Sequence, residues 1–411
     1  MTEHISESVE KVPTSALQEA AINILHENPN LPMQLRFEVS PREIIDDLLA
    51  IKDLTEPTDP EAERNIVGKI YDGVIDKLQQ YNFPNIQVVK GGPVVTAEDN
   101  FNKLLFSPGN PSRSSTYTRY IDEDHILRTH MSALIPPTLE QLEDDIDYTT
   151  FVLPGLVYRR DVIDPRHLDA FHQIDIWTLQ DSRKYGETTR EDLLNLARVV
   201  FDAACPGAEM VVYEADHPYT LGGIEVYAKV NGREIEVFEA GLAHPDVLRN
   251  SGIDPDIYSG LALGMGVERL VMARKDLPDI RLIRSTDPRV TRQMINLEQF
   301  VDVSSMPAIV RDMSFCITKG DTEEDICETI RMAFGDSSDL LEEVTILERT
   351  PFEELVPVAR ERLGATEDQD NILVRVTLRH PDKTLTKKEA SVLYTSAYRL
   401  LHQGISEGYS S

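Results

Sequence analysis

Two runs of alternating apolar and polar residues, joined by Asn231-Gly232, place the strongest constraint on how this chain folds. The runs are Ile224–Val230 and Arg233–Phe238, and a period of two is typical of strands that bury one face. Asn-Gly favours the tight turn whose twist matches that of an antiparallel strand pair. The sequence therefore predicts a β-hairpin over residues 224–238.

The segments on either side of this hairpin indicate the fold class. Gly260–Gly266 is a glycine-rich strand that runs into the helical segment Val267–Arg274, and Gly155–Asp161 with Phe171–Asp175 forms a second candidate hairpin. Antiparallel hairpins that precede helices favour an α+β fold over an alternating series of parallel β-α-β units. We expect an antiparallel-sheet core that is flanked by helices.

The length of 411 residues suggests two or three domains at roughly 100–200 residues each. We expect an acidic helical N-terminal region over 1–87, a sheet-containing domain with its connector over 88–304, and a compact unit over 305–405. Within the first region, apolar spacing and capping signals predict helices at Ser15–His26, Glu43–Lys52 and Asn65–Tyr81.

The C-terminal unit combines three strand-like segments with two helix starts. The strands are expected at Ile309–Thr318, Leu341–Leu347 and Ile372–Leu378. Capping-box spacings at Asp321–Glu324 and Thr386–Glu389 each predict the start of a helix. This order of elements is typical of a split β-α-β, ferredoxin-like domain.

Composition excludes several classes of protein. The chain has 71 Asp and Glu against 41 Lys and Arg, a net charge of −30, so any nucleic acid needs a local basic patch within an adverse overall field. No apolar run approaches the ~18–20 residues of a membrane span, and Met1–Glu10 lacks the apolar core of a signal peptide. Three scattered cysteines without a CxxC pair exclude a disulfide framework or Cys-based zinc site and favour a reducing cytoplasm.

Cationic side chains gather in the loop of the second hairpin, which carries Arg159, Arg160, Arg166 and His167. Guanidinium groups pair bidentately with phosphate oxygens, so the loop suits a phosphate-bearing ligand. An exposed hairpin with ordinary salt bridges would give the same pattern. The loop alone does not decide between these interpretations.

Acidic residues accompany the first hairpin. A two-residue turn places Tyr227 opposite Glu236, so Glu225 and Glu236 share one face as diagonal neighbours, roughly 7–8 Å apart. Two carboxylates at that separation suit a hard cation such as Mg²⁺, although a solvated strand face is the simpler explanation.

The glycine-rich strand offers a third candidate feature. Gly264 and Gly266 allow a ligand to approach the backbone closely, and Arg269 follows in the first turns of the next helix. The segment matches neither the dinucleotide-binding pattern nor a Walker loop, and packing alone could also explain its glycines.

Taken in chain order, these segments resemble the catalytic core of class II aminoacyl-tRNA synthetases, and more narrowly that of phenylalanyl-tRNA synthetases of the single-chain or alpha-subunit type. The resemblance covers about residues 88–403 and extends to the family's ferredoxin-fold anticodon-binding domain at the C-terminus. The segments that carry it are Asn100-Phe101, Leu104-Leu105, Asn110–Arg113, Leu127–Ser132, Gly155–Asp161, Phe171–Gln173, Gly241–Leu248, Gly260–Arg269, Pro278–Arg281, Met306–Phe315 and Asp382–Thr386.

The resemblance implies an enzyme that activates phenylalanine with ATP and Mg²⁺ and transfers it to tRNA. It implies that Arg159 holds the α-phosphate and Arg269 the γ-phosphate, while Phe171 stacks on adenine. The full ATP-binding set that it implies is Arg159, Asp161, Arg166, His167, Phe171, Glu225, Glu236 and Arg269, in which Glu225 and Glu236 also bind the metal. The amino-acid-binding set is His130, Ser132, Gln173, Asp175, His217, Tyr219 and Ala262.

Departures from the family pattern concentrate around the amino acid. His217 and Tyr219 replace two Phe, Asp175 replaces Glu, Ile135 replaces Gln and Glu239 replaces Gly, whereas the small residue at the pocket base is retained as Ala262. A pocket with hydrogen-bonding groups discriminates sharply between substrates that do and do not pair with them.

The departures support an alternative, a synthetase paralogue that adenylates a different amino acid for tRNA or for another acceptor. A non-enzymatic RNA-binding or regulatory descendant is disfavoured, because it would have no reason to keep Arg159, Arg269 and both glutamates. The chain shows no sign of the large editing subunit of bacterial relatives, so we expect a monomer or homodimer in the cytoplasm, with tRNA and an amino acid as its partners and no membrane. The role of residues 1–87 stays open.

Overall fold

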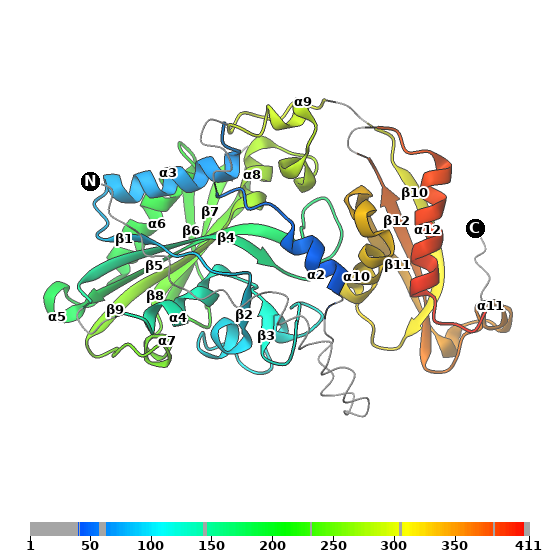
Figure 1. Ribbon diagram of the computed structural model, residues 1–411, viewed down its shortest axis with the longest axis horizontal. Coiled ribbons are helices and arrows are strands. Elements are labelled where there is room, and N and C mark those ends of the chain that lie inside the picture. Colours follow the sequence, from blue (N-terminus) through cyan, green and yellow to red (C-terminus); the bar gives the residue numbers. More distant parts are fainter. Residues whose placement is uncertain are drawn as a thin grey trace.

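A computed structural model describes residue 40 and residues 42–56, 63–142, 146–230, 232–303, 306–380 and 383–406. The helix expected at Ser15–His26 lies outside the described residues. Two bodies of secondary structure make up the fold, a large sheet with its helices and a smaller C-terminal unit (Figure 1).

The large sheet has seven strands in the order β1-β4-β5-β9-β8-β7-β6. β1 runs parallel to β4, and every other neighbouring pair is antiparallel, as the α+β expectation requires. The strands are β1 (Ile86–Val88), β4 (Tyr148–Tyr158), β5 (Ala170–Asp181), β6 (Glu209–Glu214), β7 (Thr220–Val230), β8 (Arg233–Ala243) and β9 (Tyr258–Gly266), and a separate small sheet pairs β2 (Val94–Thr96) with β3 (His125–Leu127).

The predicted hairpin is formed by β7 and β8, and its register contains a bulge. Tyr227 pairs with Glu236 as the two-residue turn predicts, but Val226 pairs with Phe238, so one extra residue lies on β8. A bulge shifts every later pair along the strand. Glu225 consequently lies opposite Glu239.

Helices cover both faces of the large sheet (Figure 1). On one face, the apolar sides of α3, α6 and α8 share a core with the sheet, and Asn65, the first residue of the expected helix, is the N-cap of α3. On the other face, α4 and α7 pack on a second core that contains Trp177. The helices of this body are α2 (Arg42–Leu49), α3 (Ile66–Gln80), α4 (Ile135–Leu139), α5 (Ser182–Tyr185), α6 (Arg190–Ala204), α7 (Pro245–Asn250), α8 (Val267–Lys275) and α9 (Pro288–Thr291), with short 3-10 segments at Pro111–Arg113, Met131–Leu134 and Ile280–Arg284 and a π-helical turn at Glu98–Asn102.

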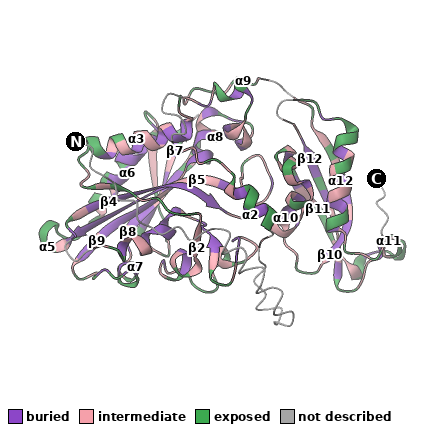
Figure 2. Ribbon diagram, viewed as in Figure 1, coloured by how far each residue is buried: buried purple, intermediate pink, exposed green. Residues whose placement is uncertain are grey.

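With helices on both sides, the central strands are buried along most of their length (Figure 2). Burial on both faces explains why β4 carries a long apolar run instead of a strict alternation.

The C-terminal unit contains a three-stranded antiparallel sheet in the order β10-β12-β11. All three strands occur where the sequence predicts them, and β10 and β11 are joined through a helix with β12 between them, the split β-α-β connection. Residues 306–380 and 383–406 hold no fourth strand of a ferredoxin-like sheet. The elements are β10 (Ile309–Thr318), α10 (Glu323–Phe334), β11 (Leu341–Pro351), α11 (Pro357–Leu363), β12 (Gln369–Leu378) and α12 (Lys387–Leu401), with 3-10 segments at Gly335–Leu340 and Phe352–Glu354.

The two helix starts of this unit differ in how well the sequence located them. Thr386 and Glu389 form the predicted capping box of α12. For α10 the predicted residues Asp321 and Glu324 were wrong by one position, because Thr322 is the N-cap and exchanges hydrogen bonds with Asp325.

The loop between β4 and β5 is anchored in the C-terminal unit. Ile163, from the tip of this loop, belongs to the apolar core of that unit, and its carbonyl accepts a hydrogen bond from the Val344 amide at 2.9 Å. Arg160 donates to Asp325 of α10 at 2.8 Å. The loop that carries the predicted phosphate-binding residues is therefore part of the contact between the two bodies.

A buried ion-pair network strengthens the same contact. Arg119 has no exposed surface and pairs with Glu328 of α10. Arg331, also on α10, donates to the Asp161 carbonyl at 2.6 Å and pairs with Asp169 at 3.6 Å. Removing one partner from a buried pair costs far more than breaking an exposed pair.

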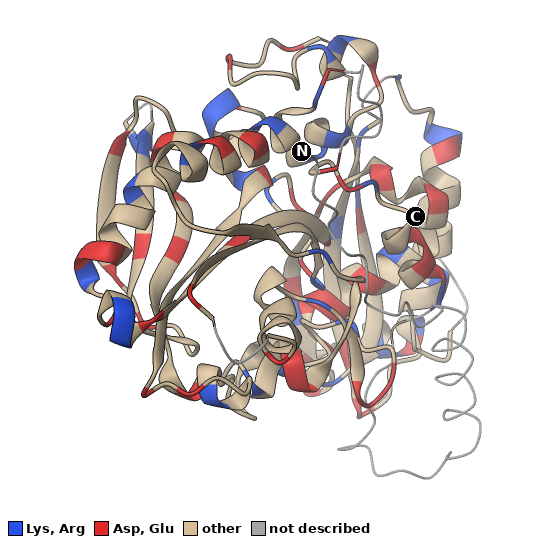
Figure 3. Cartoon of the chain, turned by 60° about the vertical axis from the view of Figure 1, so that its left-hand side comes forward, with Lys and Arg blue, Asp and Glu red and all other residues tan. Residues whose placement is uncertain are grey.

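Acidic residues are distributed along most elements of both bodies, with Lys and Arg between them (Figure 3). Among the described helices, none has the length and apolarity that crossing a bilayer requires.

Candidate active site

A cavity of about 1440 Å³ opens on the large sheet where β5, β8 and β9 meet the start of α8. This volume exceeds the ~300–1,000 Å³ of sites that hold one small ligand. Ten of the residues that sequence analysis selects line it, namely His130, Arg159, Arg166, Phe171, Gln173, Asp175, His217, Tyr219, Glu236 and Arg269.

The other selected residues lie around this cavity without lining it. Ser132 and Ala262 are buried, with exposed fractions of 2% and 1%. Asp161 and His167 lie on the loop side that faces the C-terminal unit, where His167 lines a second cavity. Glu225 stands next to the first cavity, beside two residues that line it.

Arg159 is held at the end of β4 by contacts on several sides. Its Nε donates to the Thr129 carbonyl at 3.0 Å, and its guanidinium lies 5.0 Å from the Phe171 ring centre and 5.6 Å from that of Tyr117. The remaining guanidinium nitrogens are available for an anionic ligand in the cavity. Phe171 offers a ring beside that position.

Arg269 projects from the first turn of α8 and is exposed to the cavity. Its guanidinium has no hydrogen-bond or ion-pair partner in the described part of the chain. Gly264 and Gly266 on the preceding strand also line the cavity, so the backbone there is open to close approach. A helix start with an unpaired guanidinium favours an anion.

Asp175 is a buried carboxyl group with one unpaired oxygen. Its Oδ2 accepts a hydrogen bond from the Ser132 hydroxyl at 2.6 Å, whereas Oδ1 has no partner. Burial raises the pKa of Asp175 to about 7, although the Ser132 hydrogen bond opposes this shift. The Trp177 indole donates to Ser132 at 3.2 Å and fixes the hydroxyl in place.

His130 is neutral in this site. Burial and the charge of Arg159 lower its pKa to about 3. Its Nε2 lies 3.0 Å from the Asn100 carbonyl, its Nδ1 is buried without a partner, and its ring stacks on Phe106 at 5.3 Å between centres. The unpaired nitrogen provides a second polar atom for a ligand.

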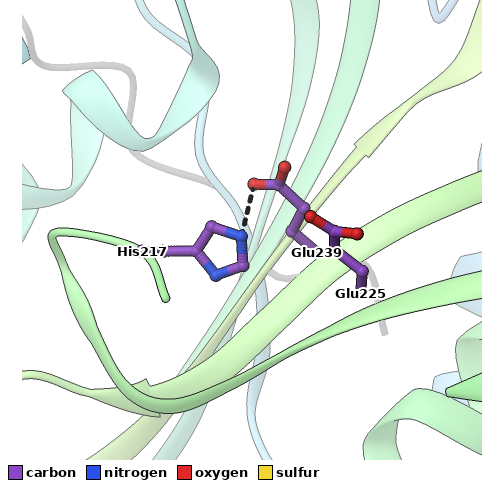
Figure 4. Close-up of side chains that lie close together, drawn as sticks. All are labelled: His217, Glu225 and Glu239. Atoms are coloured by element: carbon purple, nitrogen blue, oxygen red, sulfur yellow. Dashed lines mark ion pairs between the residues drawn. The ribbon is translucent and has the colours of Figure 1, made fainter. Parts of the chain in front are cut away.

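His217, Glu225 and Glu239 form a cluster whose ligand atoms lie within 4.8 Å of one another (Figure 4). His217 Nε2 lies 3.1 Å from Glu239 Oε2. That hydrogen bond raises the pKa of His217. Burial alone would raise the pKa of Glu239, but the hydrogen bond from His217 brings it below its ordinary value.

The carboxylates in and beside the cavity fit a divalent cation. Partial removal from water and the nearby Glu239 raise the pKa of Glu236, which Arg269 opposes. Oxygen donors suit Mg²⁺, so Glu225 and Glu236 are chemically adequate ligands. An imidazole in the donor set, as with His217, suits a transition metal better.

Sequence reasoning missed two features of this site. Glu239 was noted only as a departure from the family, and its position opposite Glu225 depends on a bulge that no local pattern announces. Trp177 pairs with Ala262 across the sheet and stacks on Tyr219 at 6.1 Å between ring centres. The presence of Trp177 in a strand expected near Ala262 was the sequence signal that could have indicated this contact.

Comparisons with known proteins identify the family of this sequence. Residues 52–294, more than half of the chain, match the tRNA synthetases class II core domain (F). A phenylalanine–tRNA ligase of Arabidopsis thaliana, described as chloroplastic or mitochondrial, is 30% identical over 315 residues, which cover 73% of this chain and 67% of the relative. The phenylalanine–tRNA ligase alpha subunit of Nostoc punctiforme is 33% identical over 229 residues, which cover 55% of this chain and 67% of that subunit.

Among solved structures, a pyrrolysyl tRNA synthetase from Desulfitobacterium hafniense has a TM-score of 0.40 and 19% identity, covering 54% of this chain and 73% of that one. The class II core domain matches more than half of this chain, and the chain spans 67% of each of the two phenylalanine–tRNA ligases. The chain belongs to the class II tRNA synthetases, in the family of phenylalanine–tRNA ligases of the alpha-subunit type.

Proposed function

We propose that this protein activates an amino acid with ATP and transfers the aminoacyl group to tRNA. The observation that carries the proposal is the placement of Arg159 and Arg269 on one cavity, together with the acidic residues Glu236 and Glu239. The family supports the reaction class, and the names of the relatives supply phenylalanine as the first candidate for the amino acid.

In the first half-reaction, a carboxylate oxygen of the amino acid attacks the α-phosphorus of ATP, and pyrophosphate leaves. The protein contributes mainly position and charge neutralisation to such a displacement. Arg159 holds the α-phosphate and carries a fixed positive charge where negative charge develops. Arg269 holds the γ-phosphate, and Arg166 assists the leaving pyrophosphate from the same cavity, whereas His167 lines the second cavity. Asp161 supports the same loop, and Phe171 stacks on the adenine.

Mg²⁺, when bound at Glu225 and Glu236, neutralises phosphate charge. The amino acid lies at the other end of the cavity. Asp175 and Gln173 receive its ammonium group, Ser132 orients Asp175, and His130, neutral because of its low pKa, adds no competing cation. In the second half-reaction, a hydroxyl of the tRNA 3′ end attacks the activated carbonyl, and AMP leaves.

A second candidate retains this chemistry but uses a different amino acid, with tRNA or another molecule as acceptor. Two observations favour it. Tyr219 and Trp177 stack on each other beside Ala262, where the family places the phenylalanine side chain, and His217 with Glu239 brings a polar pair into the cavity.

ATP–pyrophosphate exchange with a panel of amino acids, followed by tRNA charging, tests the proposal. Exchange with phenylalanine and charging of tRNA supports the first candidate. Exchange with another amino acid, or exchange without charging, supports the second. Absence of exchange with every amino acid contradicts enzymatic activation altogether.

Two further expectations accompany the proposal. We expect the reaction to occur in a reducing compartment, the cytoplasm, because Cys205, Cys316 and Cys327 are all unpaired and buried. We also expect a monomer or homodimer with a separate anticodon-binding domain over about residues 305–405 and a catalytic domain over 88–304. Sedimentation of the full chain measures the oligomeric state, and limited proteolysis measures the domain boundaries.

A further inference from the structure

A row of residues crosses four neighbouring strands at the floor of the cavity. Glu225 of β7 pairs with Glu239 of β8, Glu239 pairs with Gly264 of β9, and Gly264 pairs with Asp175 of β5. Directly paired residues point to the same face of a sheet. The carboxyl groups of Glu239 and Asp175 therefore lie on either side of Gly264, which has no side chain. Two strand spacings of about 4.8 Å put their backbones about 10 Å apart.

The Asp175 end of this row has an unpaired acceptor. Asp175 is 2% exposed, and its Oδ1 has no hydrogen-bond partner. A Cβ atom at Gly264 would lie 3.3 Å from that oxygen, so the glycine keeps the space beside it open. A buried acceptor without a partner is costly and is expected to meet a donor from a ligand.

The Glu239 end has a carboxylate that faces the same cavity. The Glu239 side chain is 37% exposed. Its ion-pair partner in the described part of the chain is His217, whose Nε2 lies 3.1 Å from Glu239 Oε2. Gly223 makes room for that imidazole, because a Cβ there would lie 2.9 Å from His217 Nδ1. Glu239 therefore keeps a second oxygen for a ligand.

The expected base of a phenyl pocket does not line the cavity. Ala262, at the expected base of a phenyl pocket, is 1% exposed, and its strand partner Trp177 is 2% exposed and stacks on Tyr219. Ala262 and Trp177 are thus both closed off from the cavity, which Tyr219 lines. A phenyl ring directed instead toward Glu239 would remove a carboxylate from water without giving it a partner.

We propose that the activated amino acid is an α,ω-diamino acid, with its α-ammonium group at Asp175 and its terminal ammonium group at Glu239, so that the chain lies over Gly264. The assignment of Asp175 to the α-ammonium group rests on the proposed adenylation function. Charge-assisted hydrogen bonds of about 2.8 Å at each end leave roughly 5–7 Å between the two nitrogens, the span of a side chain with about three or four carbons. Ornithine and lysine have this chemistry.

ATP–pyrophosphate exchange on the full chain with ornithine, lysine, norleucine and phenylalanine tests the inference. Norleucine is the matched control, because it has a similar carbon chain and no terminal amine. We expect kcat/KM for ornithine or lysine to exceed that for norleucine and phenylalanine by about 10-fold or more. Preferred exchange with phenylalanine or norleucine overturns the inference and leaves adenylation intact, whereas no exchange with any amino acid overturns adenylation as well.

Glu239→Gln identifies the residue responsible, with Glu209→Gln as the matched control. Glu209 carries the same charge on β6 of the same sheet, but it does not line the cavity and pairs with Lys229 at 3.8 Å. We expect Glu239→Gln to lower the ratio of kcat/KM for the diamino acid to kcat/KM for norleucine by about 10- to 100-fold. Equal effects of the two substitutions, or an equal loss with norleucine, would overturn the role of Glu239.

Discussion

The guanidinium carbon of Arg159 lies 5.0 Å from the centre of the Phe171 ring. Arg159 follows the end of β4 and Phe171 lies at the start of β5, so the hairpin itself brings the cation and the ring together. The same pairing places a proposed phosphate ligand next to a proposed adenine platform. A nucleotide that uses both would span the mouth of the hairpin.

Phe171→Leu is expected to weaken ATP binding while leaving the fold intact. Leu retains apolar volume but removes the π face, and stacking of a base on an aromatic ring contributes about 1–3 kcal/mol. We predict that the KM for ATP in pyrophosphate exchange rises by about 10-fold. The matched control is Phe352→Leu, which removes a ring that lies 4.3 Å from Arg360 outside the cavity. Similar KM values for the two variants would contradict the stacking role.

Asp175→Asn is expected to change how stability depends on pH. Burial raises the pKa of Asp175 to about 7 from 3.8, so between these values the folded protein holds a proton that the unfolded chain has lost. The stability that comes from protonated Asp175 is complete below pH 3.8 and is lost as pH rises through 7. Relative to the wild type, the Asn variant should therefore gain about 1–4 kcal/mol in free energy of unfolding between pH 4 and pH 8.

Urea unfolding of both proteins at pH 4 and pH 8 measures this difference. Because Asn still accepts the Ser132 hydrogen bond, the variant isolates the ionisation of the carboxyl group. A difference in unfolding free energy that is the same at both pH values would show that Asp175 titrates normally.

Glu328→Gln is expected to destabilise the contact between the two bodies. Arg119 is fully buried and would lose its charged partner, a loss that costs about 3–5 kcal/mol in typical buried pairs. The contact also holds the loop with Arg159, so the KM for ATP should rise. Asp312→Asn is the control, because its pair with Arg375 is exposed and contributes about 0–1 kcal/mol. Equal unfolding free energies for the two variants would contradict a structural role for the buried pair.

The sequence predicted those parts of the fold that depend on local patterns. Strand alternation with Asn-Gly located the β7–β8 hairpin, and the glycine-rich run located the junction of β9 and α8. The capping box of α10 was wrong by one residue, because Asp321 and Thr322 both have an acidic residue three positions on, and the structure uses Thr322 with Asp325. Two overlapping local signals of the same kind do not show which of them forms the cap.

The details of the candidate site depended on long-range structure. The bulge in β8 places Glu239 opposite Glu225, but an extra residue in a strand leaves no mark on a pattern of alternating residues. Likewise, the pKa of Asp175 depends on burial by elements far away in the sequence. The resemblance to a known family indicated which residues belong to the site. Their hydrogen-bond partners and protonation states could be determined only from the folded structure.

The central claim is that the guanidinium groups of Arg159 and Arg269 bind one triphosphate. Pyrophosphate exchange by Arg269→Ala, compared with exchange by Arg249→Ala, tests this claim most directly. Arg249 is an exposed residue of α7 that pairs with Asp246, and its loss removes the same charge from the protein. We expect Arg269→Ala to lower exchange by about 100-fold or more at the substrate concentrations that saturate the wild type, because charge stabilisation in the transition state is lost. Exchange by Arg269→Ala at the rate of Arg249→Ala would contradict the account.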